Sequence, residues 1–140
     1  MRSLVTASES ETEELAAALG AGLSGGEAVL LSGELGSGKT VFVRGLARGV
    51  GADPGEVASP TFVLLTSYPG RLTLHHADLY RLESFGEADD LGLEELPGAH
   101  GVLAVEWAER LAHAPWERKV RVVLEHAGGE HRRVTLVGEP

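Results

Sequence analysis

The stretch "SGELGSGKT", from Ser32 to Thr40, matches the phosphate-binding pattern G-x-x-x-x-G-K-[ST] at every fixed position. In such a loop the glycines let backbone N–H groups turn inward around phosphate oxygens, and the dipole of the following helix adds to the attraction. Lys39 can reach the β- and γ-phosphates, and the hydroxyl of Thr40 can hold Mg²⁺. The pattern therefore predicts a nucleoside triphosphate site. The predicted contacts in this loop are Gly33, Glu34, Leu35, Gly36, Ser37, Gly38, Lys39 and Thr40.

The segments that flank this loop have the order it requires, a strand before it and a helix after it. Residues 27–32 (EAVLLS) are a short apolar run that predicts a buried strand. After the loop, Phe42, Leu46 and Val50 recur at the spacing of one helix face. The motif thus stands in the context in which it binds phosphate.

The rest of the chain adds a helix upstream of the loop, capped by Ser8 or Ser10, and several strands. One pair of strands is predicted around a Pro69-Gly70 turn, and a later hairpin around Gly128-Gly129. We therefore expect residues 1–140 to form a single α/β P-loop NTPase-like domain. Its central sheet should be mostly parallel, with antiparallel hairpin additions and helices on both faces.

The composition limits where the protein acts and what it binds. The net charge of −9, with Lys39 and Lys119 as the only lysines, argues against a large nucleic-acid footprint. No apolar run approaches the roughly 20 residues of a membrane span, and the first residues lack the apolar core of a secretory signal. We expect a cytoplasmic protein that does not contact a membrane.

Two absent residue types exclude particular nucleotide chemistries. Without asparagine the chain cannot contain the Asn-Lys-x-Asp reader of guanine, and without glutamine it lacks the residue that orients water in small GTPases. Cysteine is also absent, which excludes disulfides and thiolate metal sites.

Two acidic residues end predicted strands, Asp78 in LHHADLY and Glu106 in VLAVEW. Ligands of open α/β sheets bind at the carboxyl ends of the strands. A triphosphate hydrolase also needs a carboxylate near its metal ion and a group that positions water. Either acid fits either role, so one holds Mg²⁺ and the other orients the attacking water. The candidate catalytic residues are Lys39, Asp78 and Glu106.

Three further features allow more than one interpretation. Thr61, in the stretch SPTF, stands where a switch segment would sense the γ-phosphate or Mg²⁺, although a plain strand start fits as well. Trp107 either stacks on a base or partner or packs in the core. His75 and His76 precede Asp78, but neighbours in a strand point to opposite faces, which disfavours a shared metal site.

A chain this short has little room for an acceptor pocket or lid, and no arginine is clearly placed to stabilise the charge of phosphoryl transfer. A partner protein would then supply that charge. One alternative is a stand-alone small-molecule kinase in which Asp78 is the base for an acceptor hydroxyl. Another is a nucleotide-sensing binder that does not turn over.

The motifs GELGSGKT, SPTF, HHADLYRL and VEWAERL, in this order and spacing, resemble the TsaE family over nearly the whole chain. These are small bacterial ATPases of tRNA threonylcarbamoyladenosine synthesis. The resemblance implies binding of ATP and Mg²⁺ and weak hydrolysis by the protein alone. It also implies activation by a TsaB–TsaD complex that the protein resets between turnovers, with tRNA contacted only through these partners.

The resemblance also assigns roles to residues. It places Thr40 and Glu106 at the metal, Asp78 as the Walker B-type aspartate, and Ser59 with Thr61 in the switch-like segment. We further expect Trp107 to contact the nucleotide.

Outside these motifs, the resemblance brings the opening between Ser8 and Thr12 toward the adenine. Glu34 and Ser37 are mild departures from the family pattern. A C-terminal arginine that lies near the nucleotide in some members has Arg132 and Arg133 as candidates here.

Overall fold

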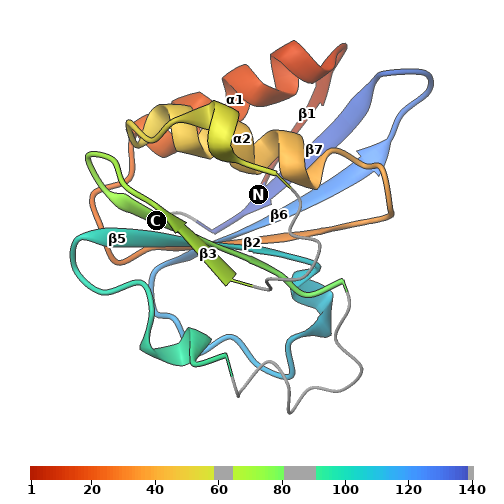
Figure 1. Cartoon of the computed structure of the whole chain (residues 1–140). Coiled ribbons are helices and arrows are strands. Elements are labelled where there is room, and N and C mark those ends of the chain that lie inside the picture. Colours follow the sequence, from red (N-terminus) through yellow and green to blue (C-terminus); the bar gives the residue numbers. More distant parts are fainter. Residues whose placement is uncertain (59–64, 81–90, 139–140) are drawn as a thin grey trace.

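The computed structural model describes residues 1–58, 65–80 and 91–138, which form an α/β domain around one sheet (Figure 1). Seven strands lie in the order β1-β7-β6-β2-β5-β4-β3. The strands are β1 (Arg2–Thr6), β2 (Ala28–Gly33), β3 (Leu65–Tyr68), β4 (Thr73–Asp78), β5 (Gly101–Glu106), β6 (Lys119–His126) and β7 (Arg132–Val137). The helices are α1 (Glu9–Ala21) and α2 (Lys39–Gly49), with short 3₁₀ turns η1 (Pro54–Glu56), η2 (Leu93–Glu95) and η3 (Ala108–Arg110).

The centre of the sheet is parallel and its edges are antiparallel. Strands β6, β2, β5 and β4 run parallel to one another. On one side β7 and β1 add an antiparallel pair, and on the other β3 returns antiparallel to β4 across the predicted turn. The predicted parallel core with hairpin additions is confirmed, and the sheet as a whole is mixed.

Both α-helices of the described residues cover the same face of the sheet (Figure 1). Helices were expected on both faces, but among the described residues the second face carries no α-helix and is covered by η2, η3 and the side chain of Trp116. The connections on that side contain Pro97 and Pro115, which lack the N–H of a helical hydrogen bond, and Gly98, whose φ of 74° is not that of a right-handed helix. In the described residues, short turns therefore replace a helix.

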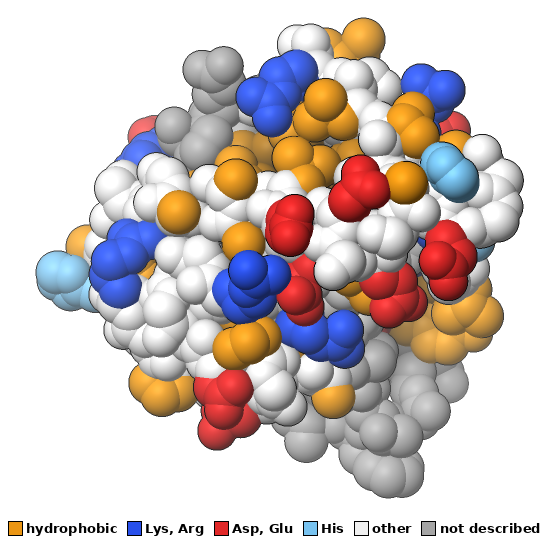
Figure 2. Space-filling view, turned by 90° about the horizontal axis from the view of Figure 1, so that it is seen from above, with side chains coloured by type: hydrophobic (Ala, Val, Ile, Leu, Met, Phe, Trp, Pro, Cys, Tyr) orange, Lys and Arg blue, Asp and Glu red, His pale blue; other side chains and the backbone are white. Residues whose placement is uncertain are grey.

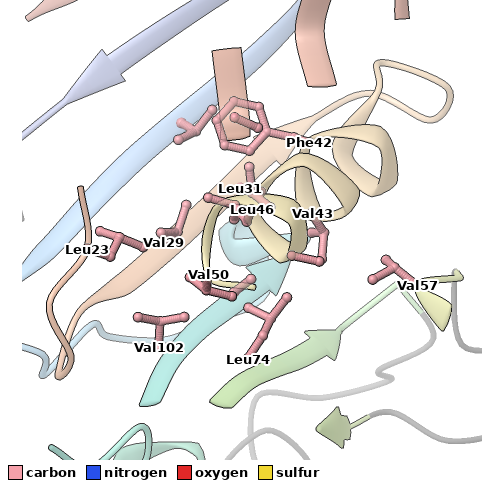
Figure 3. Close-up of a cluster of buried hydrophobic side chains, with 14 of the residues drawn as sticks. Leu23, Val29, Leu31, Phe42, Val43, Leu46, Val50, Val57, Leu74 and Val102 are labelled. Atoms are coloured by element: carbon pink, nitrogen blue, oxygen red, sulfur yellow. The ribbon is translucent and has the colours of Figure 1, made fainter. Parts of the chain in front are cut away.

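The predicted apolar face of α2 packs on the central strands. Phe42, Leu46 and Val50 lie over Val29 and Leu31 of β2 (Figure 3), and all five side chains are buried. This packing fixes α2 above the strand that ends in the phosphate loop.

Glycines on α2 allow α1 to approach it closely. A Cβ on Gly45 would overlap the backbone carbonyl of Glu13 and the side chain of Ala16, both in α1. On the other helix, a Cβ on Gly20 would lie 2.8 Å from the carbonyl oxygen of Leu46. The capping residue of α1 is Ser8, whose hydroxyl accepts a hydrogen bond from the N–H of Glu11, and not Ser10.

The outer side of the helical layer carries acidic, basic and hydrophobic side chains together (Figure 2). A cavity of about 570 Å³ between α1 and the strands beside it is lined by Leu15, Leu19, Phe42, Val120 and Leu136, among others. None of the predicted site residues lines it. No helix in the described ranges combines the length and apolar character needed to cross a membrane.

A buried carboxylate fixes the start of β2. Glu27 accepts hydrogen bonds from the N–H groups of Ser24 and Gly25, at 2.9 and 2.7 Å. The Arg118 guanidinium, next to β6, donates to it at 2.7 Å. Burial raises the pKa of Glu27, but these hydrogen bonds and the Arg118 charge outweigh it and hold that pKa below its usual range.

We expect Glu27→Gln to lower the free energy of unfolding at neutral pH by about 2–3 kcal/mol, because charged hydrogen bonds are lost. A lowered folded-state pKa gives stability that is present above the ordinary glutamate pKa and lost as pH falls through the folded value. The difference between wild type and variant should therefore shrink in acid. Urea unfolding over a pH series measures it, with exposed Glu125→Gln as control. A difference that is constant with pH would contradict this account.

Candidate functional site

The phosphate loop joins the end of β2 to the start of α2 (Figure 1). Gly36 and Gly38 have φ angles of 76° and 103°, a region that residues with a Cβ rarely adopt. Gly38 is the N-cap of α2, and its carbonyl accepts the first helical bond from Phe42 at 2.9 Å. The unpaired N–H groups of the first turn make this end of α2 favourable for an anion.

The ammonium group of Lys39 is folded back onto its own loop. Its Nζ donates to the carbonyl oxygens of Gly33 and Glu34, at 2.5 and 2.8 Å, and to the hydroxyl of Ser37 at 3.3 Å. The same nitrogen lies 4.0 Å from the centre of the Trp107 ring, a cation–π contact. All three donors of the ammonium are thus satisfied within the loop.

The surroundings of Lys39 shift its pKa in two opposing directions. Burial lowers the pKa of Lys39, whose side chain is almost fully covered. The carboxylates of Glu109, Glu106 and Asp78 raise that pKa and offset part of the lowering. These three acids therefore lie near enough to the cation to act on it electrostatically.

Glu106 ends β5 and is 2% exposed. The hydroxyl of Thr40 lies 2.9 Å from its Oε1 and 3.1 Å from its Oε2. The same carboxylate has a second partner, Nε2 of His76, which lies 2.6 Å from Oε2. The structure thus links Thr40 to Glu106 through a direct hydrogen bond.

Asp78 stands opposite Glu106 in the parallel register of β4 and β5. It is 5% exposed, and its Oδ1 accepts a hydrogen bond from the N–H of Tyr80 at 3.0 Å. Residues directly opposite in a sheet share a face. The two predicted carboxylates therefore lie side by side at the carboxyl edge of the parallel strands.

Trp107 covers this edge from the side. It is the only non-glycine residue with positive φ among those described, at 60°. Its ring lies 5.0 Å from that of Tyr80, and the Arg110 guanidinium lies 5.6 Å from the Trp107 ring. The half-buried ring packs against the core on the second face of the sheet and also contacts the loop lysine, while stacking on a base or partner stays a prediction.

A second cavity, of about 160 Å³, adjoins the other side of the phosphate loop. Its lining is Glu9, Thr12, Gly36, Gly38, Val41, Glu130 and Arg132. Arg132 also donates from Nη2 to the carbonyl of Gly36 at 3.3 Å, whereas Arg133 does not line the cavity. Of the opening residues singled out in the sequence, Thr12 reaches this cavity and Ser8 does not.

The structure brings together Lys39, Thr40, Asp78, Glu106 and Trp107 from three segments of the chain. In the loop, the side chain of Leu35 is 69% exposed and contributes little to this cluster. Ser59 and Thr61 lie outside the described residues, as does Arg81, which with Arg44 was a sequence candidate for stabilising the charge of phosphoryl transfer.

Two residues that contact the site, His76 and Glu109, were not predicted from the sequence in these roles. His76 was considered only as a metal ligand, yet it contacts Glu106; its position two residues before Asp78 on the same strand face was an available signal. Glu109 accepts a hydrogen bond from the N–H of Gly33 at 3.3 Å, which no pattern in the sequence indicates.

Comparison with known proteins shows to which family this chain belongs. The family described as "Threonylcarbamoyl adenosine biosynthesis protein TsaE" matches residues 6–134. The chain belongs to the TsaE family. The matched span includes the phosphate loop, both acids at the strand ends and Arg132.

Curated members of the TsaE family are similar along most of the chain. The tRNA threonylcarbamoyladenosine biosynthesis protein TsaE of Treponema pallidum is 41% identical, over 94% of this chain and 97% of its own length. The TsaE of Bacillus subtilis is 37% identical, over 94% and 82% respectively. The crystal structure of Bacillus subtilis YdiB superposes with a TM-score of 0.75 at 32% identity, covering 99% of this chain and 86% of that one. The TsaE resemblance and the α/β fold predicted from the sequence are thereby confirmed.

Proposed function

We propose that this protein binds and hydrolyses Mg²⁺-bound ATP, weakly alone and faster with a TsaB–TsaD complex, as a component of tRNA threonylcarbamoyladenosine synthesis. The observation that carries this proposal is the meeting of Lys39, Thr40, Asp78 and Glu106 at one edge of the sheet. Membership of the TsaE family supports the pathway.

The donor set fits Mg²⁺. This ion prefers oxygen ligands and is usually held by one or two protein groups together with substrate phosphates. The Thr40 hydroxyl and the Glu106 carboxylate are such oxygens and already lie within 2.9 Å of each other. When bound, Mg²⁺ would neutralise charge that develops on the phosphate oxygens.

Lys39 changes partners when the nucleotide binds. Its ammonium leaves the carbonyls of Gly33 and Glu34 and donates instead to β- and γ-phosphate oxygens. The exchange is favourable because a buried cation gains an anionic partner in place of neutral ones. It also removes the cation from the face of Trp107, so that the emission of this ring should report nucleotide binding.

The two carboxylates then have different tasks. Glu106, bonded to Thr40, is assigned to the metal. Asp78, opposite it and closely surrounded by protein, is assigned to orienting the water that attacks the γ-phosphate. The hydrogen bond from Thr40 to Glu106 supports this division of the two roles that the sequence left open.

The cavity beside the loop is proposed as the site of the adenine. It shares Gly36 and Gly38 with the phosphate loop, so a base there is connected to phosphates at the loop. The carboxylates of Glu9 and Glu130 can accept hydrogen bonds from an exocyclic amine. The planar guanidinium of Arg132 can lie against a base.

The partner is proposed to approach the rim of the site. Leu35 and Tyr80, 69% and 45% exposed, offer apolar surface next to the nucleotide. Arg110 is engaged over the rings of Tyr80 and Trp107. A partner that contacts this rim can complete the charge stabilisation. With a net charge of −9, the chain is expected to meet tRNA only through these partners.

Steady-state ATP hydrolysis, alone and with the cognate TsaB–TsaD pair, tests the proposal. Wild type should be slow alone and strongly stimulated by the pair. In Glu106→Ala we expect the stimulated rate to fall by about 100-fold or more, because electrostatic stabilisation of the transition state is lost. The exposed variant Glu125→Ala is the control and should match wild type. Equal turnover with and without the pair would contradict partner activation and favour a stand-alone kinase.

The adenine site gives a second prediction. Arg132→Ala should weaken ATP binding about 3- to 10-fold, the loss expected for one cationic contact. Its neighbour Arg133→Ala, which does not line the cavity, is the matched control and should bind as wild type does. Titration calorimetry with ATP measures both. Equal affinities of the two variants would place the base elsewhere.

A further inference from the structure

A buried histidine is hydrogen-bonded to Glu106, the carboxylate proposed to hold the metal. His76 is fully buried in β4, and its Nε2 lies 2.6 Å from Oε2 of Glu106. We propose that His76 is a positioning residue that fixes the orientation of the Glu106 carboxylate toward Thr40 and the metal. The inference rests on the proposed function, because it concerns the same Mg²⁺–nucleotide site.

The strand register explains how this contact arises. In the parallel pair β4–β5, His76 stands opposite Ala104, and Asp78 stands opposite Glu106. Residues two apart on a strand share a face, so the histidine and Glu106 are diagonal neighbours. The small side chain of Ala104, itself fully buried, leaves the imidazole room to reach across to the carboxylate.

The chemistry of the contact fixes where the imidazole hydrogen lies. A carboxylate oxygen only accepts hydrogen bonds, so Nε2 of His76 is the donor to Glu106. The other ring nitrogen, Nδ1, is buried and has no partner among the described residues. A hydrogen on Nδ1 would thus be an unsatisfied buried donor, and the Nε2–H form is the one that the site stabilises.

These hydrogen bonds fix the orientation of the Glu106 carboxylate. His76 donates to Oε2, and the Thr40 hydroxyl lies 2.9 Å from Oε1 and 3.1 Å from Oε2. Without the histidine, Glu106 keeps Thr40 as its donor and can rotate about its own side-chain bonds. Hydrogen bonds to the groups that ligate a metal typically contribute 10- to 100-fold to metal affinity. We expect a contribution of about this size from His76.

The test is the Mg²⁺ requirement of nucleotide binding, followed by Trp107 emission during titration of Mg²⁺ at fixed ATP. His76→Leu removes the donor and keeps an apolar side chain in the core. It should raise the Mg²⁺ concentration for half-maximal binding by about 10- to 100-fold, while ATP binding in excess EDTA stays as in wild type. His76→Gln carries an N–H near the place of Nε2 and should restore much of the loss.

The matched control is His75→Leu. His75 precedes His76 on the same strand, faces the opposite side of the sheet and lies with Nδ1 2.8 Å from the Ser67 hydroxyl. This variant should leave the Mg²⁺ requirement unchanged. A His76→Leu protein with the wild-type Mg²⁺ requirement, or a His75→Leu protein with the same shift, would overturn the positioning role. A wild type whose nucleotide binding does not respond to Mg²⁺ would instead overturn the proposed function.

One measurement does not depend on the folding of a variant. Long-range ¹⁵N–¹H correlation spectra of the wild type, with the His76 signal assigned, distinguish the two imidazole tautomers. The Nε2–H form supports the contact with Glu106, and the Nδ1–H form overturns it.

Discussion

The buried carboxylate of Glu106 accepts the hydrogen bonds on which the site depends. It ends the central strand β5, where the chain must bury an acid beside the phosphate loop, and burial is tolerable only because the group has partners. Thr40 comes from α2 and His76 from β4, so one side chain connects three elements of the fold. The parallel register that pairs β5 with β4 and β2 places it there.

The phosphate loop also provides the hydrogen-bond acceptors for its own lysine, Lys39. Lys39 is bonded to loop oxygens and covered by Trp107, so the site without nucleotide contains no exposed, unpaired ammonium. We infer that binding of ATP must displace these internal contacts. A partner that moves the ring of Trp107, or of its neighbour Tyr80, would alter these contacts of Lys39 and thereby change how readily ATP binds. Such control would suit the partner-activated hydrolysis that we propose.

Much of this could be predicted from the sequence, because local patterns determine it. The glycine loop, the buried strand before it and the apolar face of α2 all depend on spacing within about a dozen residues, and all three were found. The sequence could place His76 on the same strand face as Asp78, but not in contact with Glu106, because that contact depends on which strands are neighbours and on the small side chain of Ala104. Helices on both faces were expected from the general plan of such domains. Proline and glycine in the connections give only short turns there in the described residues.

The most direct test of the account is a crystal structure with Mg²⁺ and a non-hydrolysable ATP analogue. We predict that Nζ of Lys39 leaves the carbonyl oxygens of Gly33 and Glu34 for the β- and γ-phosphates. The Thr40 hydroxyl should turn to the metal, with Glu106 beside it and still bonded to His76. A nucleotide bound elsewhere, with Lys39 and Thr40 keeping their present partners, would contradict the account.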